Sequence, residues 1–378
     1  MSPSTITQAH ACAPENEQWS ARFIAPENLP GTLAQSFDLL QLHRLNGARY
    51  PHILESAARG GVQARFDILF AFPGDTLTLE ANGRLSGADH IERKRDKGFL
   101  STFDRWWGQA MFPAPVTMEI GSVPPFHGGW FLYLGYELAR EIEPTLDFPS
   151  APGDFPIAFA TRFPAAVIRD HESGEVTLVA ETGQEDLLDK MESDLAALAQ
   201  SPPPPFTDTP CLEGDLDEDP PPQHLENLRH CIDYIYAGDV FQVNLSRAWR
   251  GRLAPGLSHA HLYDRLRGCN PAPFAGLVTR GDDAIISSSP ERLVEVRGRI
   301  IQTRPIAGTR PRGSSGITDV ALSEELLAHP KERAEHIMLV DLERNDISRV
   351  CKPGSVRVDE MMVVESYAHV HHIVSNVR

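Results

Sequence analysis

Two runs of proline, Pro202–Pro205 and Pro220–Pro222, divide this chain into two parts. Proline lacks a backbone N–H and has a fixed φ, so it interrupts helices and the interior of sheets. The residues between the two runs are rich in acidic side chains. We therefore predict that residues 201–222 form an irregular linker between an N-terminal part, residues 1–200, and a C-terminal part, residues 223–378.

The N-terminal part contains short apolar runs bounded by turn residues, a pattern typical of strands. The predicted strands are Arg65–Phe72, Gly129–Tyr136, Ala165–Ile168 and Val176–Ala180. The segment Leu187–Ala199 has apolar residues at helical spacing, which predicts an amphipathic helix.

The C-terminal part mixes helices and strands without regular alternation. We predict helices over His224–Ala237, His259–Gly268 and, with a break near Pro330, Ser323–Asn345. We predict strands over Val240–Trp249, Phe274–Thr279, Ala284–Ser288, Leu293–Val296 and Arg299–Thr303. This order favours an α+β fold over a doubly wound parallel sheet.

The chain is acidic, with a formal net charge of −17 over 378 residues. Such a charge disfavours phosphate backbones and anionic lipids, so we expect no nucleic-acid partner. No apolar run approaches the length of a membrane span, so we expect no membrane partner. The five cysteines are odd in number, and none has CxxC spacing. Together with an N-terminus unlike a signal peptide, this predicts reduced thiols in a cytoplasmic protein.

Residues 303–313, TRPIAGTRPRG, are predicted to form a turn-rich loop that combines arginines with a glycine allowing close backbone approach. The helix that begins near Lys331 carries Glu332 and Glu335, three residues apart, on one face. Cations, close backbone and clustered carboxylates indicate a metal-assisted site for a small anionic substrate. The alternative is a plain surface turn beside solvated helix carboxylates.

Two further positions that could take part in catalysis also fit ordinary structural roles. Glu291 follows Ser-Ser-Ser-Pro and fits a helix or turn cap. His371 and His372 lie beside an apolar strand and fit core or rim residues. The residues alone leave these alternatives open.

Several segments taken together closely resemble the chorismate-utilising enzymes, in particular the chorismate-binding components of anthranilate synthase and aminodeoxychorismate synthase. They are YAGDVFQVNLSR (236–247), NPAPF (270–274), SSPERLVEVRGRIIQTRPIAGTRPRG (288–313), KERAEHIMLVDLERND (331–346) and VESYAHVHHIVSNV (364–377). The resemblance implies two antiparallel β-sheets packed around a core with helices outside. It also implies that the C-terminal part binds chorismate and that the N-terminal part is regulatory or structural.

The resemblance further implies roles for single residues. Glu335 matches a glutamate that binds Mg²⁺, through which the substrate carboxylate is held, and Glu332 matches its acidic neighbour. Glu291 matches a general acid or base, and His372 matches a histidine that transfers a proton beside the ring. The segment Ala307, Gly308 and Thr309 matches the substrate-contacting loop. This chemistry suits a dicarboxylate whose ring hydroxyl must leave with a proton.

Two positions bear on the nucleophile. Water-using relatives tend to carry a lysine base where this chain has Gln242, so glutamine indicates amination by ammonia; an ordinary polar strand residue is the alternative. Many aminodeoxychorismate synthases carry a lysine at the position of Ala307 that attacks the ring. Alanine there resembles anthranilate synthase and also a subclass of aminodeoxychorismate synthases thought to use ammonia instead.

The product is indicated by segments outside these positions. RFDILFA (65–71), GGWFLYLGYELAREIEP (128–144) and NPAPF resemble the aminobenzoate branch, whereas ILES (53–56) resembles the tryptophan-inhibitor segment of anthranilate synthases. The inhibitor-site candidates are Leu54, Glu55, Ser56, Asn270, Pro271, Ala272, Pro273 and Phe274.

We therefore expect an ammonia-dependent subunit that forms aminodeoxychorismate for p-aminobenzoate and folate synthesis. A glutamine amidotransferase partner is expected to supply ammonia, because no glutaminase pattern occurs in the chain. Anthranilate synthase component I and a non-catalytic chorismate-binding fragment are the alternatives. The family pattern continues beyond VHHIVSNV with a glycine-rich segment, a helix and strands. Since these do not follow Arg378 here, we expect the activity of the 378-residue chain to be incomplete.

Overall fold

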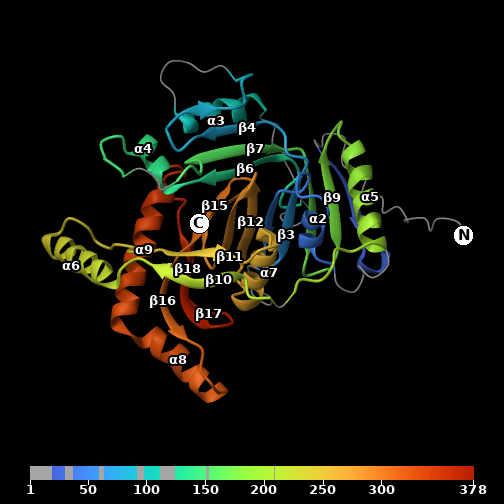
Figure 1. Cartoon of the computed structure of the whole chain (residues 1–378). Coiled ribbons are helices and arrows are strands. Elements are labelled where there is room, and N and C mark those ends of the chain that lie inside the picture. Colours follow the sequence, from blue (N-terminus) through green and yellow to red (C-terminus); the bar gives the residue numbers. More distant parts are fainter. Residues whose placement is uncertain are drawn as a thin grey trace, which may run out of the picture. The chain divides into compact units, whose positions relative to one another are not determined.

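The structure, a computed structural model, describes residues 19–29, 37–58, 64–91, 98–110, 124–149, 153–207 and 209–378. The chain forms two compact units (Figure 1). The first comprises Met1–Pro204 and Arg265–Arg378, and the second comprises Pro205–Asp264.

A seven-stranded antiparallel sheet in the order β1-β9-β8-β3-β2-β12-β13 forms the largest layer of the first unit. Its strands are β1 (Trp19–Ile24), β2 (His52–Glu55), β3 (Phe66–Ala71), β8 (Ala165–Asp170), β9 (Val176–Glu181), β12 (Phe274–Arg280) and β13 (Asp283–Ser289). Helices α2 (Leu39–Leu45) and α5 (Asp186–Gln200) pack against it and against each other. The predicted helix is confirmed in α5, which buries Leu188, Met191 and Leu195 at helical spacing.

A four-stranded sheet in the order β5-β4-β7-β6 comes from the same unit. It comprises β4 (Thr76–Leu79), β5 (Leu85–Ser86), β6 (Gly129–Leu134) and β7 (Ala158–Phe163), and α3 (Phe99–Gln109) packs against β4. The indole rings of Trp106 and Trp130 meet edge to face, with centroids 5.5 Å apart, within its core. Short helical turns lie at η1 (Pro26–Asn28), η2 (Tyr136–Leu138) and α4 (Ala139–Ile142).

A five-stranded sheet carries four of the candidate site residues, Ala307, Gly308, Thr309 and His372. Its order is β14-β15-β18-β16, and β17 also pairs with β18. The strands are β14 (Arg292–Arg297), β15 (Ile300–Arg304), β16 (Ile306–Pro311), β17 (Val358–Ser366) and β18 (Val370–Val377). Helix α9 (Pro330–Ser348) packs against β15 to β18, and α8 (Gly316–Ala328) precedes it. The predicted break near Pro330 is confirmed, because this proline begins α9, where its missing N–H costs no hydrogen bond.

The second unit differs from the sequence predictions at two places. It contains α6 (Pro221–Ala237), the first part of α7 (His259–Cys269) and an antiparallel hairpin of β10 (Leu212–Glu218) and β11 (Trp249–Leu253). Strand β10 therefore lies inside the predicted linker, because β11 supplies a partner that the local sequence does not reveal. The strand predicted over Val240–Trp249 is wrong, since residues 240–248 are irregular and β11 begins only at Trp249.

The predicted α+β class with antiparallel sheets is confirmed. Where the resemblance implied two sheets, the described residues form three larger sheets and one hairpin. Within the described ranges, no helix is long and apolar enough to cross a membrane. The described cysteines Cys211, Cys231, Cys269 and Cys351 are free thiols, and Cys12 lies outside the described residues.

Candidate active site

The segment predicted as a turn-rich loop, residues 303–313, is mostly strand. It comprises the end of β15 and all of β16, separated by Pro305. Gly308 has a φ of +93°, and the pairing of β16 with β18 shifts register between Ile306 and Thr309. A Cβ at Gly308 would lie 3.1 Å from Ile373 Cδ1 and 3.3 Å from Glu332 Oε2. Glycine is thus required both by the backbone conformation and by the close approach of the Glu332 carboxylate.

His372 lies on β18 between residues of two neighbouring strands. Thr309 on β16 and Glu365 on β17 are its cross-strand partners. The Nδ1 atom of His372 is hydrogen-bonded to Thr309 Oγ1 at 2.9 Å. Burial lowers the pKa of His372, and the nearby negative charge of Glu365 only partly offsets this effect. The imidazole is therefore mostly neutral at pH 7 and is held in place by Thr309.

The two carboxylates on α9 have different surroundings. Glu332 Oε1 accepts a hydrogen bond from Arg310 Nη1 at 3.1 Å, and its side chain is only 14% exposed. The Glu335 carboxylate stands 4.0 Å from Lys331 Nζ and is 31% exposed. The resemblance gave both residues roles near a metal, and the helix does place them three residues apart on α9.

The fit of these carboxylates to Mg²⁺ follows from their chemistry. The described residues hold no group of three or more His, Cys, Asp or Glu side chains suited to a metal ion. Mg²⁺ is, however, often bound by one or two carboxylates together with substrate oxygens and waters. Glu335 and Glu332 fit that kind of partial ligand set. Glu332 forms an ion pair with Arg310, and the resemblance assigns the direct contact with the metal to Glu335.

Glu291 and Ala307 are both fixed through the backbone of β16. Glu291 Oε1 accepts a hydrogen bond from the Ile306 N–H at 2.8 Å. The carbonyl oxygen of Ala307 accepts one from His336 Nδ1 at 3.1 Å, and His336 Nε2 bonds Ser375 Oγ at 2.6 Å. His336 and Ser375 are fully buried, so α9, β16 and β18 are joined by a polar link inside the core.

The arginines around this segment are engaged by carboxylates. Arg310 pairs with Glu325 and Glu332. Arg312 donates two hydrogen bonds to Asp319, at 2.8 and 2.6 Å, and together they hold down the pKa of that carboxyl.

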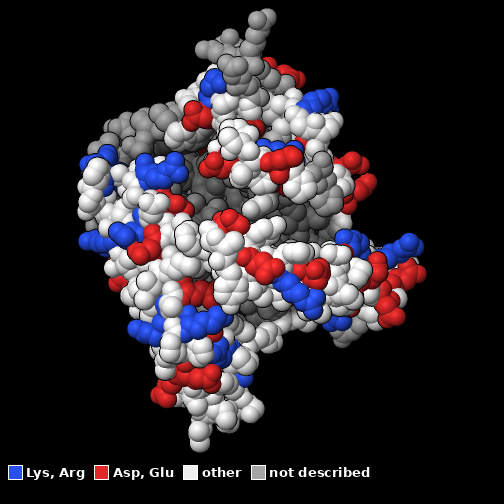
Figure 2. Space-filling model, turned by 90° about the vertical axis from the view of Figure 1, so that its left-hand side faces the viewer, with Lys and Arg blue, Asp and Glu red and all other residues white. Residues whose placement is uncertain are grey.

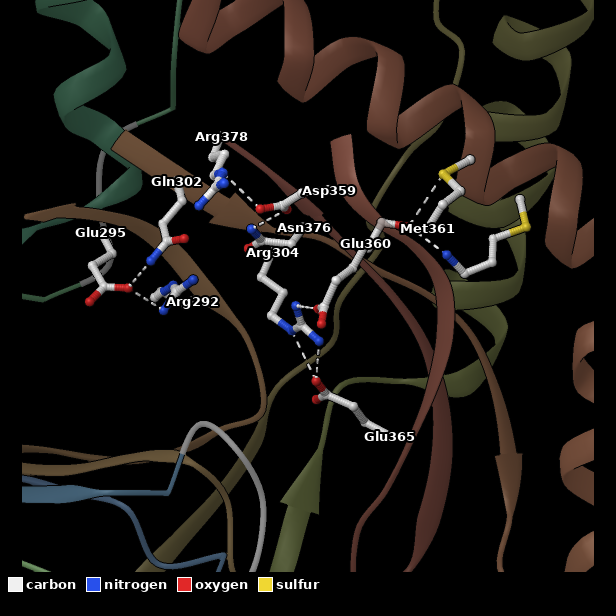
Figure 3. A network of polar contacts seen from close by, with 12 residues as sticks. Arg292, Glu295, Gln302, Arg304, Asp359, Glu360, Met361, Glu365, Asn376 and Arg378 are labelled. Atoms are coloured by element: carbon white, nitrogen blue, oxygen red, sulfur yellow. Dashed lines mark hydrogen bonds and ion pairs between the residues drawn. The ribbon is translucent and has the colours of Figure 1, made fainter. Parts of the chain in front are cut away.

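Arg304 is the most enclosed of these arginines. Figure 3 shows its guanidinium between Glu360 and Glu365, which approach from β17. The Arg304 side chain is 10% exposed, and Glu365 Oε1 accepts from its Nε at 2.9 Å and its Nη2 at 2.6 Å. Figure 2 likewise shows basic and acidic side chains intermingled on the face it displays. The arginines of the sequence motif thus form ion pairs with neighbouring elements: Arg304 with strand β17, Arg310 with helices α8 and α9, and Arg312 with α8.

The segments predicted to form an inhibitor site come together in the first unit. Strand β2 pairs with β12, so Glu55 lies opposite Ala275. Ser56 Oγ donates to the Pro273 carbonyl at 3.2 Å, and Ser56 N–H donates to Asp67 at 2.9 Å. Glu55 accepts from Arg267 Nη1 at 2.8 Å. Leu54 is 40% exposed on the same strand. Whether this region binds an inhibitor stays a prediction.

A pocket with a volume of ≈ 210 Å³ lies beside His372. One wall is the turn of residues 270–273, and the other is the turn of residues 367–370. The pocket thus brings Asn270, Pro271, Ala272 and Pro273 to the same cavity as the candidate proton-transferring histidine. Phe274, the last residue of that motif, begins β12.

Gln242 belongs to the second unit, in the irregular residues 240–248. The residues that the first unit brings together are Glu291, Ala307, Gly308, Thr309, Glu332, Glu335 and His372. Sequence reasoning missed His336, Ser375, Glu365 and Tyr367, whose roles depend on partners distant in sequence.

Comparison with known proteins finds a matching family and similar sequences. A family model described as chorismate binding enzyme matches residues 62–378. The anthranilate synthase component I-like protein of Synechocystis sp. is 41% identical over 273 residues, covering 70% of this chain and 53% of the relative. The aminodeoxychorismate synthase component 1 of Bacillus subtilis is 35% identical over 354 residues, covering 90% of this chain and 72% of the relative.

Among solved structures, anthranilate synthase component I from Streptococcus pneumoniae aligns with a TM-score of 0.68 at 29% identity. The alignment covers 84% of this chain and 69% of that one. The chain spans about half the length of the Synechocystis relative.

Proposed function

Because the chain belongs to the family of chorismate-binding enzymes, we propose that it is the ammonia-dependent, chorismate-aminating component of an aminodeoxychorismate synthase. The reaction replaces the ring hydroxyl of chorismate by an amino group. Ammonia forms the new C–N bond and gives up one proton, and the hydroxyl leaves with a proton as water. The product, 4-amino-4-deoxychorismate, would serve p-aminobenzoate and folate synthesis.

The observation that carries this proposal is that the chain combines Ala307 with an N-terminal part whose segments resemble the aminobenzoate branch. Ala307 offers no nucleophile, so amination here proceeds without a covalent enzyme adduct. Strands β3 and β6 are built from the RFDILFA and GGWFLYLGY segments that resemble the aminobenzoate branch. The similarity to an aminodeoxychorismate synthase component extends over 90% of this chain.

The site residues would share the proton transfers. Glu291 and His372 supply groups that can hold and deliver a proton, and Thr309 fixes the orientation of the imidazole. Gly308 allows the backbone of β16 to approach the ring closely. A Mg²⁺ ion held by Glu335, with Glu332 nearby, would offset the charge of a substrate carboxylate. A separate glutamine amidotransferase would supply ammonia.

Anthranilate synthase component I is the second candidate. It is favoured by the 41% identity to an anthranilate synthase component I-like protein and by the contact between Ser56 and Pro273, which joins the ILES and NPAPF segments. In that case the product would be anthranilate, and residues 54–56 and 270–274 would hold an inhibitor.

Product identification tests these alternatives. The chain is incubated with chorismate, Mg²⁺ and ammonium, and the products are separated by liquid chromatography, with an ammonium-free sample as the control. We expect aminodeoxychorismate that appears only with ammonium. Anthranilate would replace the proposal by the second candidate. Chorismate binding without turnover would mean that this chain is a non-catalytic binding fragment.

A further inference from the structure

The pocket beside His372 is lined by apolar residues, three of them prolines, together with the polar residues Asn270, Ser288, Tyr367, His369 and His372. One wall is the turn of residues 270–273, which contains Pro271 and Pro273, and Pro290 adds to the lining. The opposite wall begins with Tyr367. A volume of ≈ 210 Å³ is below the ~300–1,000 Å³ of pockets for drug-sized ligands. The cavity therefore suits a compound with a single ring.

The ring of Tyr367 is held in place by ionic partners. Its hydroxyl donates to Glu365 Oε2 at 2.5 Å, and the other oxygen of Glu365 accepts two hydrogen bonds from Arg304. The Tyr367 N–H also donates to the Val370 carbonyl at 2.8 Å, which closes the turn. The ring centroids of Tyr367 and His372 lie 5.8 Å apart. Glu365 is also the cross-strand neighbour of His372, so the carboxylate that holds Tyr367 lies opposite the histidine in the sheet.

A hydrogen bond connects the two walls of the pocket. His369 Nε2 lies 2.7 Å from the carbonyl oxygen of Cys269, which immediately precedes the proline-rich turn. A carbonyl oxygen only accepts, so this nitrogen carries the proton and donates. Ser288 Oγ also donates to the Asn270 carbonyl from below the same turn. The spacing between the walls is thus set by hydrogen bonds before any ligand enters.

We propose that this pocket receives the ring of the substrate and that Tyr367 is a further substrate-binding residue, positioned by Glu365 and Arg304. The inference rests on the proposed function. The Tyr367 face and the proline faces pack on the two sides of the ring, and His372 is a titratable side chain in the same lining. Residues 270–273, expected to serve an inhibitor, would then be part of the substrate pocket.

Binding of chorismate to the whole chain tests this inference, with four variants compared by calorimetric titration in the presence of Mg²⁺. Tyr367→Leu removes the aromatic wall, and we expect the Kd for chorismate to rise about tenfold, as for the loss of one buried aromatic contact. Tyr367→Phe keeps the ring but loses the bond to Glu365, and a smaller rise is expected. Ala368→Phe fills the pocket from an exposed lining position and should abolish binding without disturbing the core. The matched control is Tyr136→Leu, at a tyrosine that is 83% exposed.

The outcomes separate the two levels of inference. A parent chain that binds chorismate, with Tyr367→Leu and Ala368→Phe binding equally well, overturns the pocket assignment alone. A parent chain that binds no chorismate overturns the proposed function and this inference with it. Weakened binding in both pocket variants, with Tyr136→Leu unchanged, supports the assignment, and Ala368→Phe decides the matter if Tyr367→Leu does not fold.

Discussion

The hydroxyl of Thr303 is hydrogen-bonded to the carboxyl group of Glu343, which joins strand β15 to helix α9. The same hydroxyl oxygen lies 2.8 Å from the carbonyl oxygen of Leu293. A hydroxyl has one proton, so it donates to only one of these two oxygens. If it donates to the carbonyl, the carboxyl group must supply the other proton. We expect this second arrangement, in which Glu343 is a neutral carboxylic acid in the folded chain.

The surroundings of Glu343 agree with this assignment. Burial raises the pKa of Glu343, a hydrogen bond from Thr303 lowers it in part, and the negative charges of Glu291 and Asp346 raise it further. A carboxyl whose pKa is higher in the folded than in the unfolded chain stabilises the fold at pH values below its unfolded pKa. That stabilisation is lost as the pH rises through the folded pKa.

Glu343→Gln tests the protonation state, because the amide mimics a neutral carboxylic acid. We expect the free energy of unfolding of the parent, relative to the variant, to fall as the pH rises from 4.5, the ordinary pKa of the group. The slope for one proton is at most about 1.4 kcal/mol per pH unit. Urea unfolding of both proteins at a series of pH values measures this pH dependence of the free energy of unfolding. Parallel curves would show that Glu343 is charged in the folded chain.

Glu335→Gln is expected to abolish Mg²⁺-dependent turnover and to leave the fold intact. Loss of an outer-shell partner lowers metal affinity about 10–100-fold. Loss of a charged oxygen ligand should lower it at least as much. Product formation against Mg²⁺ concentration measures the effect, and the exposed Glu324→Gln on α8 serves as the control. Equal Mg²⁺ dependence in both variants and the parent would contradict the assignment of Glu335 as ligand.

His336→Ala is expected to destabilise the chain, because the carbonyl of Ala307 and the hydroxyl of Ser375 both lose a buried partner. Each unsatisfied group costs about 1–3 kcal/mol. Denaturant unfolding checks this against His230→Ala, at a histidine whose side chain is 61% exposed on α6. A loss no larger than in that control would mean that the link between α9, β16 and β18 adds nothing to stability.

No covalent chorismate adduct is expected at position 307. The Ala307 side chain has no nucleophile, so any intermediate of amination is free to dissociate. Mass spectrometry of the protein denatured after incubation with chorismate tests this, with protein denatured before incubation as the control. A stable adduct that maps to residues 303–313 would exclude the noncovalent mechanism.

The parent chain should form negligible isochorismate when ammonia is withheld, if Gln242 marks an amine nucleophile. Gln242→Lys places a base that can activate water once its pKa is lowered, and slow isochorismate formation is the expected gain. Gln184→Lys, at an exposed glutamine, is the control. Abundant isochorismate from the parent itself would replace amination by water addition as the natural reaction.

Local sequence patterns predicted many of the helices and strands but not their partners. The α5 periodicity and the break at Pro330 were visible because each depends on neighbouring residues only. Residues 303–313 were predicted as a loop because prolines and glycines punctuate them. They form strand β16 because β18 pairs with them, and His372 meets Thr309 from 63 positions further along.

For the site residues, too, the residue types were visible in the sequence, whereas their partners were not. The charge of Arg304 is evident from sequence, whereas its enclosure by Glu360 and Glu365 depends on strand β17. His336 carries no sequence signal of its importance, since Ala307 and Ser375 reach it from other elements. The resemblance supplied Glu291, Gly308, Glu335 and His372, which spacing alone left as ordinary polar residues.

Strand β18 is paired with β16 and, at Val377, with β15, and it also pairs with β17; seven of its eight residues are buried. Backbone amides in such a position exchange with solvent deuterium only through the largest opening motions of a fold. His372 and its neighbours should accordingly be among the slowest-exchanging amides of the first unit. The imidazole at the edge of the pocket is thus carried by a strand that we expect to open late, whereas the exposed residues Ala368 and His369 in the facing turn should exchange earlier.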